Sequence, residues 1–226
     1  MTSASRDVSA RAPASVTGAR LTSKGLATRA RIVAAASELM LAQGTARTTI
    51  EDIQAAAQVS ASQMYHYFAD KDALVMAVID FQEEQVFALQ HQGLDGLDSF
   101  AALTRWRDLV VNSARGIGCA GGCPLGSLAS DLSEADPVAR VRLAGSFARW
   151  ESMLERGLAA IRDRGELVPD ANPAELALAL LAAVQGGLLL GQVRRDVRPL
   201  EVAIDTVLAR VRDLAVPATG ARSLGR

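Results

Sequence analysis

The sequence predicts an all-α protein with a small N-terminal helix-turn-helix domain and a larger helical C-terminal domain. Apolar residues recur at helical spacing along most of the 226 residues, and no stretch shows the alternation of a half-buried strand. Half of the residues are hydrophobic but only 4% are aromatic, so the apolar content is mostly Ala, Leu and Val, which favours helices. This apolar content also excludes a generally disordered chain.

Charge is unevenly distributed along the chain, although the net charge is only −1 at pH 7. Residues 1–47 carry seven basic and two acidic groups, a balance of +5, and the remainder carries 17 basic and 23 acidic groups, a balance of −6. This asymmetry predicts a basic end for an anionic partner and excludes a chain that coats nucleic acid along its whole length. We expect residues 1–20 to be a disordered basic arm and residues 216–226 a tail.

Three helices are predicted after the arm. An apolar face runs over residues 23–43 and ends at a glycine, which is typical of a helix C-terminus. Thr48 and Glu51 have the spacing of a capping box and open a short second helix. Ser60 and Gln63 have the same spacing and open a third. Two short capped helices joined by a tight turn, with a helix before them, are typical of a helix-turn-helix unit.

The third helix, residues 61–68, is predicted to present a polar face that suits DNA. Met64 and Phe68 lie four residues apart and would hold the helix against its scaffold. The exposed face then offers side chains that hydrogen-bond base edges and phosphates: Ser62, Gln63, Tyr65, His66 and Tyr67. An alternative, in which the aromatic residues fill a core, is disfavoured because the inward row is already occupied.

Other polar groups near this helix are expected to bind the DNA backbone. Lys71 begins the next helix, where its ammonium is a point charge for a phosphate. Thr48 and Thr49 stand at a helix N-terminus, which favours an anion. His66 is not expected to bind a metal, because the only other histidine, His91, has no ligand-like spacing to it. We predict neither a metal nor a cofactor.

The chain after the helix-turn-helix unit, which we assign to residues 21–70, is predicted to form a larger helical domain over residues 71–215. We expect six helices, at about residues 70–91, 97–115, 125–132, 136–164, 172–193 and 199–214. A glycine-rich break, residues 116–126, separates the second of these from the third. The fourth is expected to bury Val141 and Trp150 among its apolar residues.

The helix expected at residues 172–193 is apolar enough to raise the alternative of a membrane span. Only Gln185 and Gln192 interrupt the apolar run from Leu176 to Val193. A span needs about 20 such residues, however, and the flanking amphipathic helices need an apolar surface to pack on. Small residues recur every four positions, at Ala179, Ala183, Gly187 and Gly191. Because this row allows another helix to approach closely, we predict a buried helix or a subunit interface and no membrane contact.

The segment TTIEDIQAAAQVSASQMYHYFADKDAL resembles the DNA-binding segment of TetR/AcrR-type transcriptional regulators. The resemblance covers about residues 24–78, with I-x-x-I-x-x-A-A, V-S, Y-H-Y-F and K-x-x-L at fixed spacing. It implies an all-helical homodimer with a three-helix DNA-binding unit and a C-terminal domain that binds a small molecule and dimerises. We therefore expect a cytoplasmic one-component repressor that leaves a palindromic operator when a small apolar or aromatic ligand binds.

The contacts of this family can be carried over onto the matching positions. Its phosphate contacts correspond to Thr48, Thr49, Tyr65, Tyr67 and Lys71, and its base-reading positions to Ser62, Gln63 and His66. Gln58 departs from the family, which usually has glycine there, so the turn lacks the residue that most easily adopts a positive φ. Ala61 and Ser62 replace a frequent basic–glycine pair. These departures bear on operator sequence and affinity.

The C-terminal half resembles a subgroup of the family more loosely. The segments GCPLGSLASDL and QGGLLLGQVRRD are similar to multidrug- or flavonoid-responsive regulators of the LmrA/YxaF type. The resemblance implies that the helices at about 172–193 and 199–214 form the four-helix bundle of the dimer. It also implies a ligand cavity, for which we predict Trp106, Asn112, Phe147, Arg149, Trp150 and Met153. Helical spacing alone is equally typical of a core.

Cys119 and Cys123 lie in the glycine-rich break and leave alternatives open. Cys123 directly precedes an expected helix start, where a thiolate is favoured, so the pair would sense oxidation and release DNA. Two small buried residues at a tight turn are the simpler explanation. A helical thiol enzyme is a rival from another class. No histidine lies near the cysteines in the sequence and no catalytic motif surrounds them, so we expect no enzyme.

Overall fold

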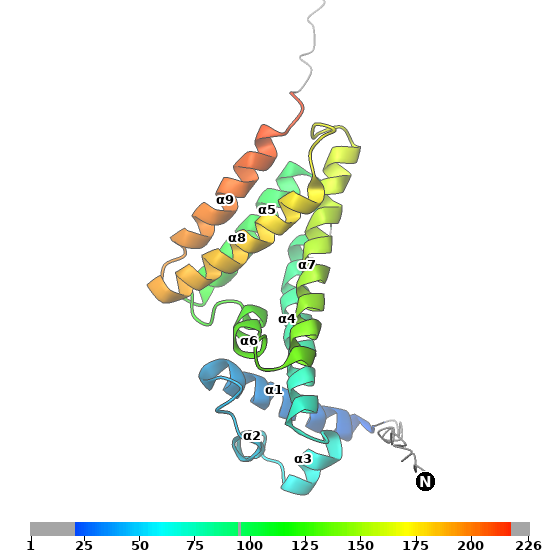
Figure 1. The fold of residues 1–226 in the computed structure, drawn as a ribbon, viewed down its shortest axis with the longest axis vertical. Helices are drawn as coiled ribbons and strands as arrows, with labels where there is room; N and C mark the ends of the chain where they lie inside the picture. The colour runs from blue at the N-terminus through cyan, green and yellow to red at the C-terminus, as the bar shows by residue number, and fades with distance from the viewer. Residues whose placement is uncertain (1–20, 95, 218–226) are drawn as a thin grey trace, which may run out of the picture.

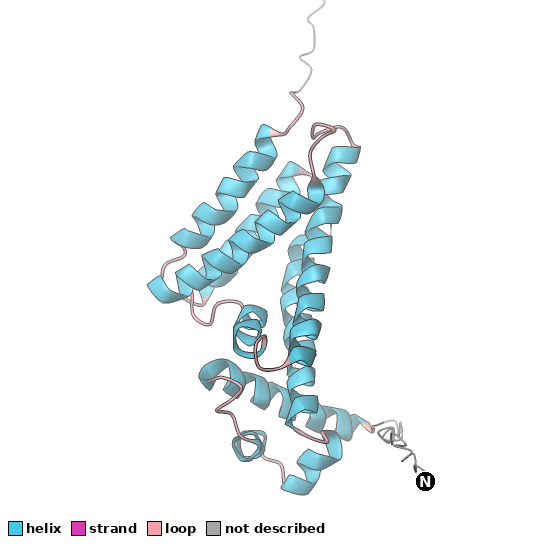
Figure 2. Cartoon of the chain, viewed as in Figure 1, coloured by secondary structure: helices cyan, strands magenta, loops and turns pink. Residues whose placement is uncertain are grey.

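The computed structural model describes residues 21–94 and 96–217, and the long elements in these residues are all helices (Figures 1 and 2). Along this part of the chain the helices are α1 (Ser23–Gln43), α2 (Ile50–Ala57), α3 (Ala61–Tyr67), α4 (Lys71–Leu94), α5 (Phe100–Gly116), α6 (Pro124–Leu132), α7 (Pro137–Asp163), α8 (Pro173–Arg194) and α9 (Arg198–Asp213). Helices α1 to α3 form a small head at one end, and α4 leads from it into a body made with α5 to α9 (Figure 1). The predicted fold class is confirmed.

Side-chain caps set where the short head helices begin. Ser60 and Gln63 form the predicted capping box at the start of α3. The box of α2 is formed by Thr49 and Asp52, one residue later than predicted. The sequence offers both pairs at the same spacing, and the structure selects the second because Thr48 is fully buried in the head. Hydrogen bonds from Thr49 hold the pKa of Asp52 below its usual value.

The turn between α2 and α3 depends on an unusual backbone conformation at Gln58. This residue has φ 53° and ψ 51°, in the left-handed region that glycine adopts most easily. Its backbone N–H donates to the carbonyls of Ala55 and Gln54, which closes the end of α2. The expectation that this position requires a positive φ is therefore confirmed, with glutamine in place of the usual glycine.

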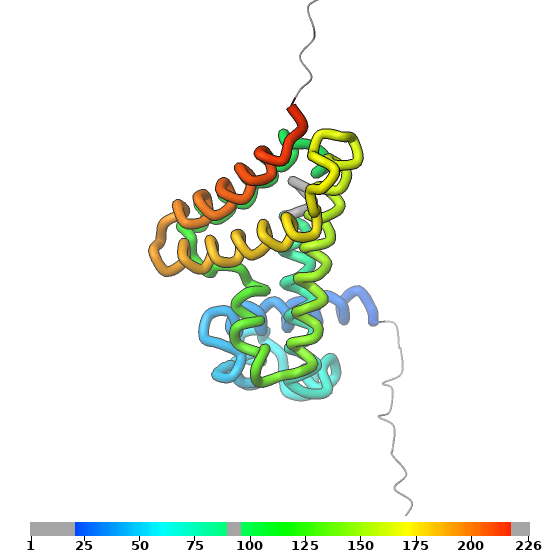
Figure 3. Tube along the Cα trace, turned by 45° about the horizontal axis from the view of Figure 1, so that its top comes forward, coloured from blue at the N-terminus to red at the C-terminus, as the bar shows by residue number. Residues whose placement is uncertain are grey.

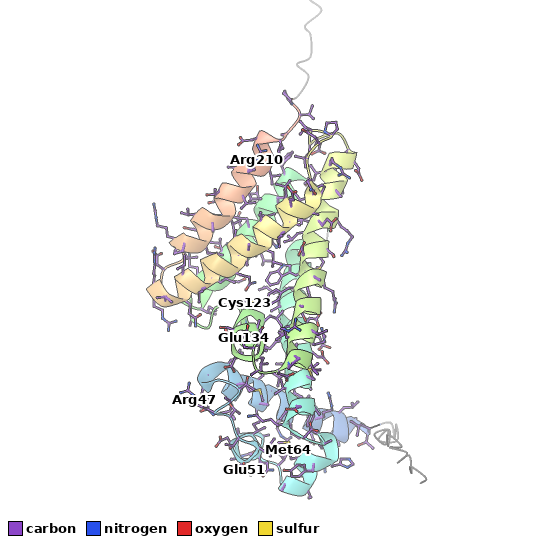
Figure 4. The ribbon with its side chains drawn as sticks, in the orientation of Figure 1. Arg47, Glu51, Met64, Cys123, Glu134 and Arg210 are labelled. Carbon is purple, nitrogen blue, oxygen red and sulfur yellow. The ribbon has the colours of Figure 1, made fainter. Side chains whose placement is uncertain are left out.

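The head has its own apolar core. Ile32 of α1, Ile53 of α2 and Leu74 of α4 are fully buried, and Met64 of α3 is almost so. Phe68, directly after α3, is 4% exposed, so the predicted inward pair of this helix is confirmed. Figure 4 shows Met64 inside the head, between α3 and the helices behind it. Because these side chains anchor α3 from within, its opposite face is left to solvent.

The body is built along α4 and α7, which lie side by side on the long axis of the molecule (Figures 1 and 3). Trp150 and Leu154 of α7 are buried as predicted. The prediction for Val141 is wrong: its side chain is 63% exposed, because the first turns of α7 extend beyond the neighbours that bury the rest. Gly157 is required where α7 meets the start of α5, since a Cβ there would lie 2.2 Å from the carbonyl oxygen of Leu97.

Helix α8 packs on α7 and α9 and is part of the helical body (Figure 3). Gly187 allows the contact with α9, because a Cβ at this position would lie 2.6 Å from Cα of Leu200. The predicted row of small residues thus serves packing within one subunit at this point. Among the described residues, α8 alone is long and apolar enough to cross a membrane by length and composition. Core helices of soluble proteins pass the same test.

Candidate nucleic-acid interface and ligand cavity

The outward face of α3 carries the side chains that were expected to read DNA. Tyr65 is 59% exposed, and Ser62, Gln63 and His66 are exposed as well. Tyr67 is half-buried, and its ring meets that of His66 edge-on, with the centroids 4.9 Å apart. Helix α3 lies at the outer end of the head (Figure 1). A short exposed helix with hydrogen-bonding and aromatic side chains has the form that enters a major groove.

Two of these side chains also take part in the cap of α3. Gln63 Oε1 accepts a hydrogen bond from the backbone N–H of Ser60 at 3.0 Å. The hydroxyl oxygens of Ser60 and Ser62 lie 3.1 Å apart. A base contact through the Gln63 carbonyl oxygen therefore competes with the capping box, whereas Tyr65 and His66 face the solvent without this constraint.

The expected backbone contacts fall into three situations. Thr48 is fully buried and its hydroxyl donates to the carbonyl of Gly44 at 2.9 Å, so the prediction that it binds phosphate is corrected to a structural role. Thr49 is exposed at the N-terminus of α2, where its hydroxyl donates to Asp52 at 2.7 Å. Lys71 is half-buried and its ammonium donates to the carbonyl of Thr45 at 2.6 Å, which secures the loop between α1 and α2.

Three arginines on the head belong to the same surface and were not proposed individually from the sequence. Arg47 is exposed beside α2, where its Nε donates to the carbonyl of Gln43 at 2.7 Å (Figure 4). Arg31 donates to the carbonyl of Ala57 at 2.8 Å, and the guanidinium of Arg29 lies 5.1 Å from the ring centroid of Phe68. The basic balance of residues 1–47 was the signal for these residues, since it placed positive charge in this region without selecting positions.

The head is hydrogen-bonded to the body through the loop before α2. The backbone N–H of Thr45 donates to Asp131 Oδ2 of α6 at 2.5 Å, and the carbonyl of the same residue accepts from Lys71 of α4. The peptide groups around Thr45 are therefore held by two helices of the body. A displacement of α6 relative to α4 has to pull on this loop, and through it on α2.

Charged side chains also connect α4 to α7. Glu83 of α4 is buried and forms ion pairs with Arg142 and Arg149 of α7, the latter at 2.5 Å. Arg142 reaches Asp80 at 2.6 Å as well, and Arg149 lies over the ring of Phe87, 4.8 Å from its centroid. These contacts tie the helix that carries the head to the longest helix of the body, and they place Arg149 on the surface between the two helices.

A cavity of about 320 Å³ lies inside the body, between α4, α5, α7, α8 and the start of α6. We call it the core cavity. Its apolar walls include Val86, Leu89, Val110, Ile117, Val184 and Leu188. Gln85, Ser113 and Trp150 add polar atoms, and no charged side chain lines it. A mostly apolar cavity with few polar groups, at the lower end of the usual size range, is typical of a small-molecule site.

A second cavity, of about 640 Å³, lies where the head meets the body. We call it the junction cavity. Met40 and Leu41 of α1 form its head side, and α6, α7 and α8 contribute Ser127, Phe147 and Gln185. The Nε2 atom of Gln185 is buried with no hydrogen-bond partner in the described part of the chain. Cys123 lines both cavities and so stands between them.

The residues predicted for the ligand cavity are dispersed rather than gathered. Trp150 lines the core cavity and Phe147 the junction cavity, whereas Met153 faces a shallow surface hollow. Trp106 is fully buried and lines none of these hollows. The prediction for Asn112 is corrected: it is exposed, and its Oδ1 accepts from Arg115 at 2.6 Å on the surface of α5.

Both cysteines are buried free thiols. Cys123 is the N-cap of α6, as its position before a proline predicted, and its Sγ accepts from the backbone N–H of Gly126 at 3.4 Å. Burial nevertheless raises the pKa of this thiol above its usual value. Cys119 has φ 54° in the glycine-rich loop and is packed against α8 near Gly191. These surroundings favour a structural role over a reactive thiolate.

Comparison with known proteins links this geometry to a family. Residues 32–78 match the family model described as bacterial regulatory proteins, tetR family, and residues 100–207 match the tetracyclin repressor-like C-terminal domain. An uncharacterised helix-turn-helix regulator from Lactococcus lactis, encoded in the lacX 3′ region, is 31% identical over 79% of this chain and 90% of its own. The chain belongs to the TetR family of transcriptional regulators.

Two further proteins show how this TetR-family chain compares with others. YxaF of Bacillus subtilis strain 168, an uncharacterised helix-turn-helix regulator, is 24% identical over 85% of this chain and 98% of its own. The structure of SmeT in complex with triclosan is 28% identical, with a TM-score of 0.65 over 88% of this chain and all of that one. The protein is thus a transcriptional regulator with a DNA-binding head and a ligand-binding body, as the sequence predicted.

Proposed function

We propose that this TetR-family protein is a repressor that binds a palindromic operator as a homodimer and leaves it when a small apolar or aromatic ligand binds. The observation that carries the proposal is the continuity of α6 between cavity and head. Cys123, at the start of α6, lines the core cavity, and Asp131, near its end, holds the backbone of Thr45 in the head. A ligand that displaces α6 acts directly on the loop before α2.

Exposed apolar side chains support dimerisation through α8 and α9. Leu178, Leu189, Leu190 and Val193 of α8 and Val202 of α9 are each between 47% and 75% exposed. Side chains of this kind gathered on adjoining helices mark a protein–protein contact. Two copies related by a twofold axis would bury them in a four-helix bundle and set the distance between the two heads.

The switch then follows from geometry and linkage. The two α3 helices of a dimer enter successive major grooves, about 34 Å apart, only when the heads have the matching separation. A ligand releases the operator only if it binds the DNA-incompetent arrangement more tightly than the competent one. SmeT, solved with triclosan, supports a small organic molecule as the ligand class. Operator binding requires the cytoplasm as the location.

The oligomeric state and the operator are tested together by a pair of valine substitutions. Val193→Glu places a charge in the exposed stripe of α8, whereas Val138→Glu places one on an equally exposed part of α7, at 75% and 67% exposure respectively. Sedimentation velocity should show dimers for the wild type and Val138→Glu and monomers for Val193→Glu, with operator binding lost in the monomer. A monomeric wild type that binds its operator tightly would contradict the proposal.

A further inference from the structure

The core cavity contains one buried hydrogen-bond donor that is left without an acceptor. Trp150 is 2% exposed and lines this cavity. Its Nε1 atom is buried with no partner in the described residues. Gln82, at the same wall, is already engaged, because its Nε2 donates to the hydroxyl of Ser37 at 2.5 Å. An unsatisfied buried N–H is costly, so the site favours any occupant that supplies an acceptor.

The charge of the lining restricts the occupant as well. No Asp, Glu, Lys, Arg or His lines the core cavity, and most of its surface is aliphatic. A charged molecule would lose its hydration there without gaining a counter-charge, which is strongly unfavourable. The volume of about 320 Å³ suits a small ring system.

We infer that the core cavity selects a neutral, largely aromatic molecule that carries one hydrogen-bond acceptor, such as a ketone oxygen, and that this acceptor is bound by Nε1–H of Trp150. The inference rests on the proposed function, since it specifies the ligand of that same regulator. The aliphatic walls supply affinity through burial, and the indole N–H supplies orientation and selectivity. A hydrocarbon of the same shape would leave the donor unpaired and bind more weakly.

Fluorenone and fluorene test this inference because they share a ring system and differ in the carbonyl group. In isothermal titration calorimetry the wild type should bind fluorenone about tenfold more tightly than fluorene, the factor that corresponds to one hydrogen bond. Trp150→Phe keeps an aromatic ring but removes the N–H and should abolish this preference. Trp106→Phe changes the other buried tryptophan, which does not line the core cavity, and should retain it.

Several results would overturn the inference. Equal affinity of the wild type for both compounds, no binding of either, or a preference that survives Trp150→Phe would each do so. Tight binding of fluorene-9-carboxylate would contradict the requirement for a neutral molecule. Operator binding by the unliganded proteins is measured separately, so a regulator that fails to bind DNA refutes the proposed function while the fluorenone preference is still scored. Trp150→Phe should bind operator as the wild type does, because the indole lies in the body.

Discussion

The left-handed residue between α2 and α3 gives the sharpest test of the fold. Gln58 has φ 53° and ψ 51°, a conformation that costs a residue with a Cβ about 1–2 kcal/mol. Glycine adopts it freely but adds about 0.5–1 kcal/mol of backbone entropy to the unfolded state. Gln58→Gly should therefore stabilise the protein by about 0.5–1 kcal/mol, or raise its melting temperature by about 1–4 °C.

The same substitution four residues earlier is the matched control. Gln54 lies within α2, where the backbone is right-handed, so Gln54→Gly gains nothing and should lower stability by about 0.5–1 kcal/mol. Thermal unfolding followed by circular dichroism measures both variants, at one protein concentration because dimerisation is concentration-dependent. A melting temperature of Gln58→Gly at or below that of the wild type would refute the assignment of a left-handed residue to this turn.

Three further predictions concern the body, the arm and the cysteines. Glu83→Gln should lower the free energy of unfolding by about 1–3 kcal/mol, because Glu83 is buried between two partly solvated arginines, and urea denaturation compared with the exposed Asp80→Asn measures this. Deleting residues 1–20, which lie outside the described residues, should weaken operator binding modestly and reduce the slope of log K against log salt by about 0.9 per lost phosphate contact; an unchanged slope excludes the arm from binding. Peroxide and diamide should leave operator affinity unchanged, since Cys119 and Cys123 are buried, and a loss that dithiothreitol reverses would instead support redox sensing.

Much of the head was predictable because its signals are local. The capping box at Ser60, the inward pair Met64 and Phe68 and the special backbone at Gln58 all involve residues within a few positions of one another. The α2 cap was misplaced by one residue because two threonine–acid pairs have the same spacing. Only tertiary burial of Thr48 distinguishes between them.

The ligand cavity was harder to predict because helical spacing does not separate a core from a pocket. Trp106 and Trp150 both occupy inward positions, yet only the second lines the core cavity. Asn112 was suggestive because it stands beside apolar residues, but the helix turns it outward to Arg115. The buried ion pairs of Glu83 and the bond between Asp131 and Thr45 join segments 59 or more residues apart, and no sequence pattern indicated them.

Sequence-selective DNA binding through α3 is the central claim, and fluorescence anisotropy tests it most directly. The DNA that flanks the protein's own gene would be titrated at two salt concentrations with the wild type, with a Tyr65→Ala, His66→Ala variant, and with Arg210→Ala, which removes a charge at the far end of the molecule from the head (Figure 4). Lys71 is left intact because it holds the loop at Thr45. We predict tight binding that is at least tenfold weaker in the α3 variant and unchanged in Arg210→Ala. Weak binding that is equal on random DNA and indifferent to the α3 substitutions would contradict the account.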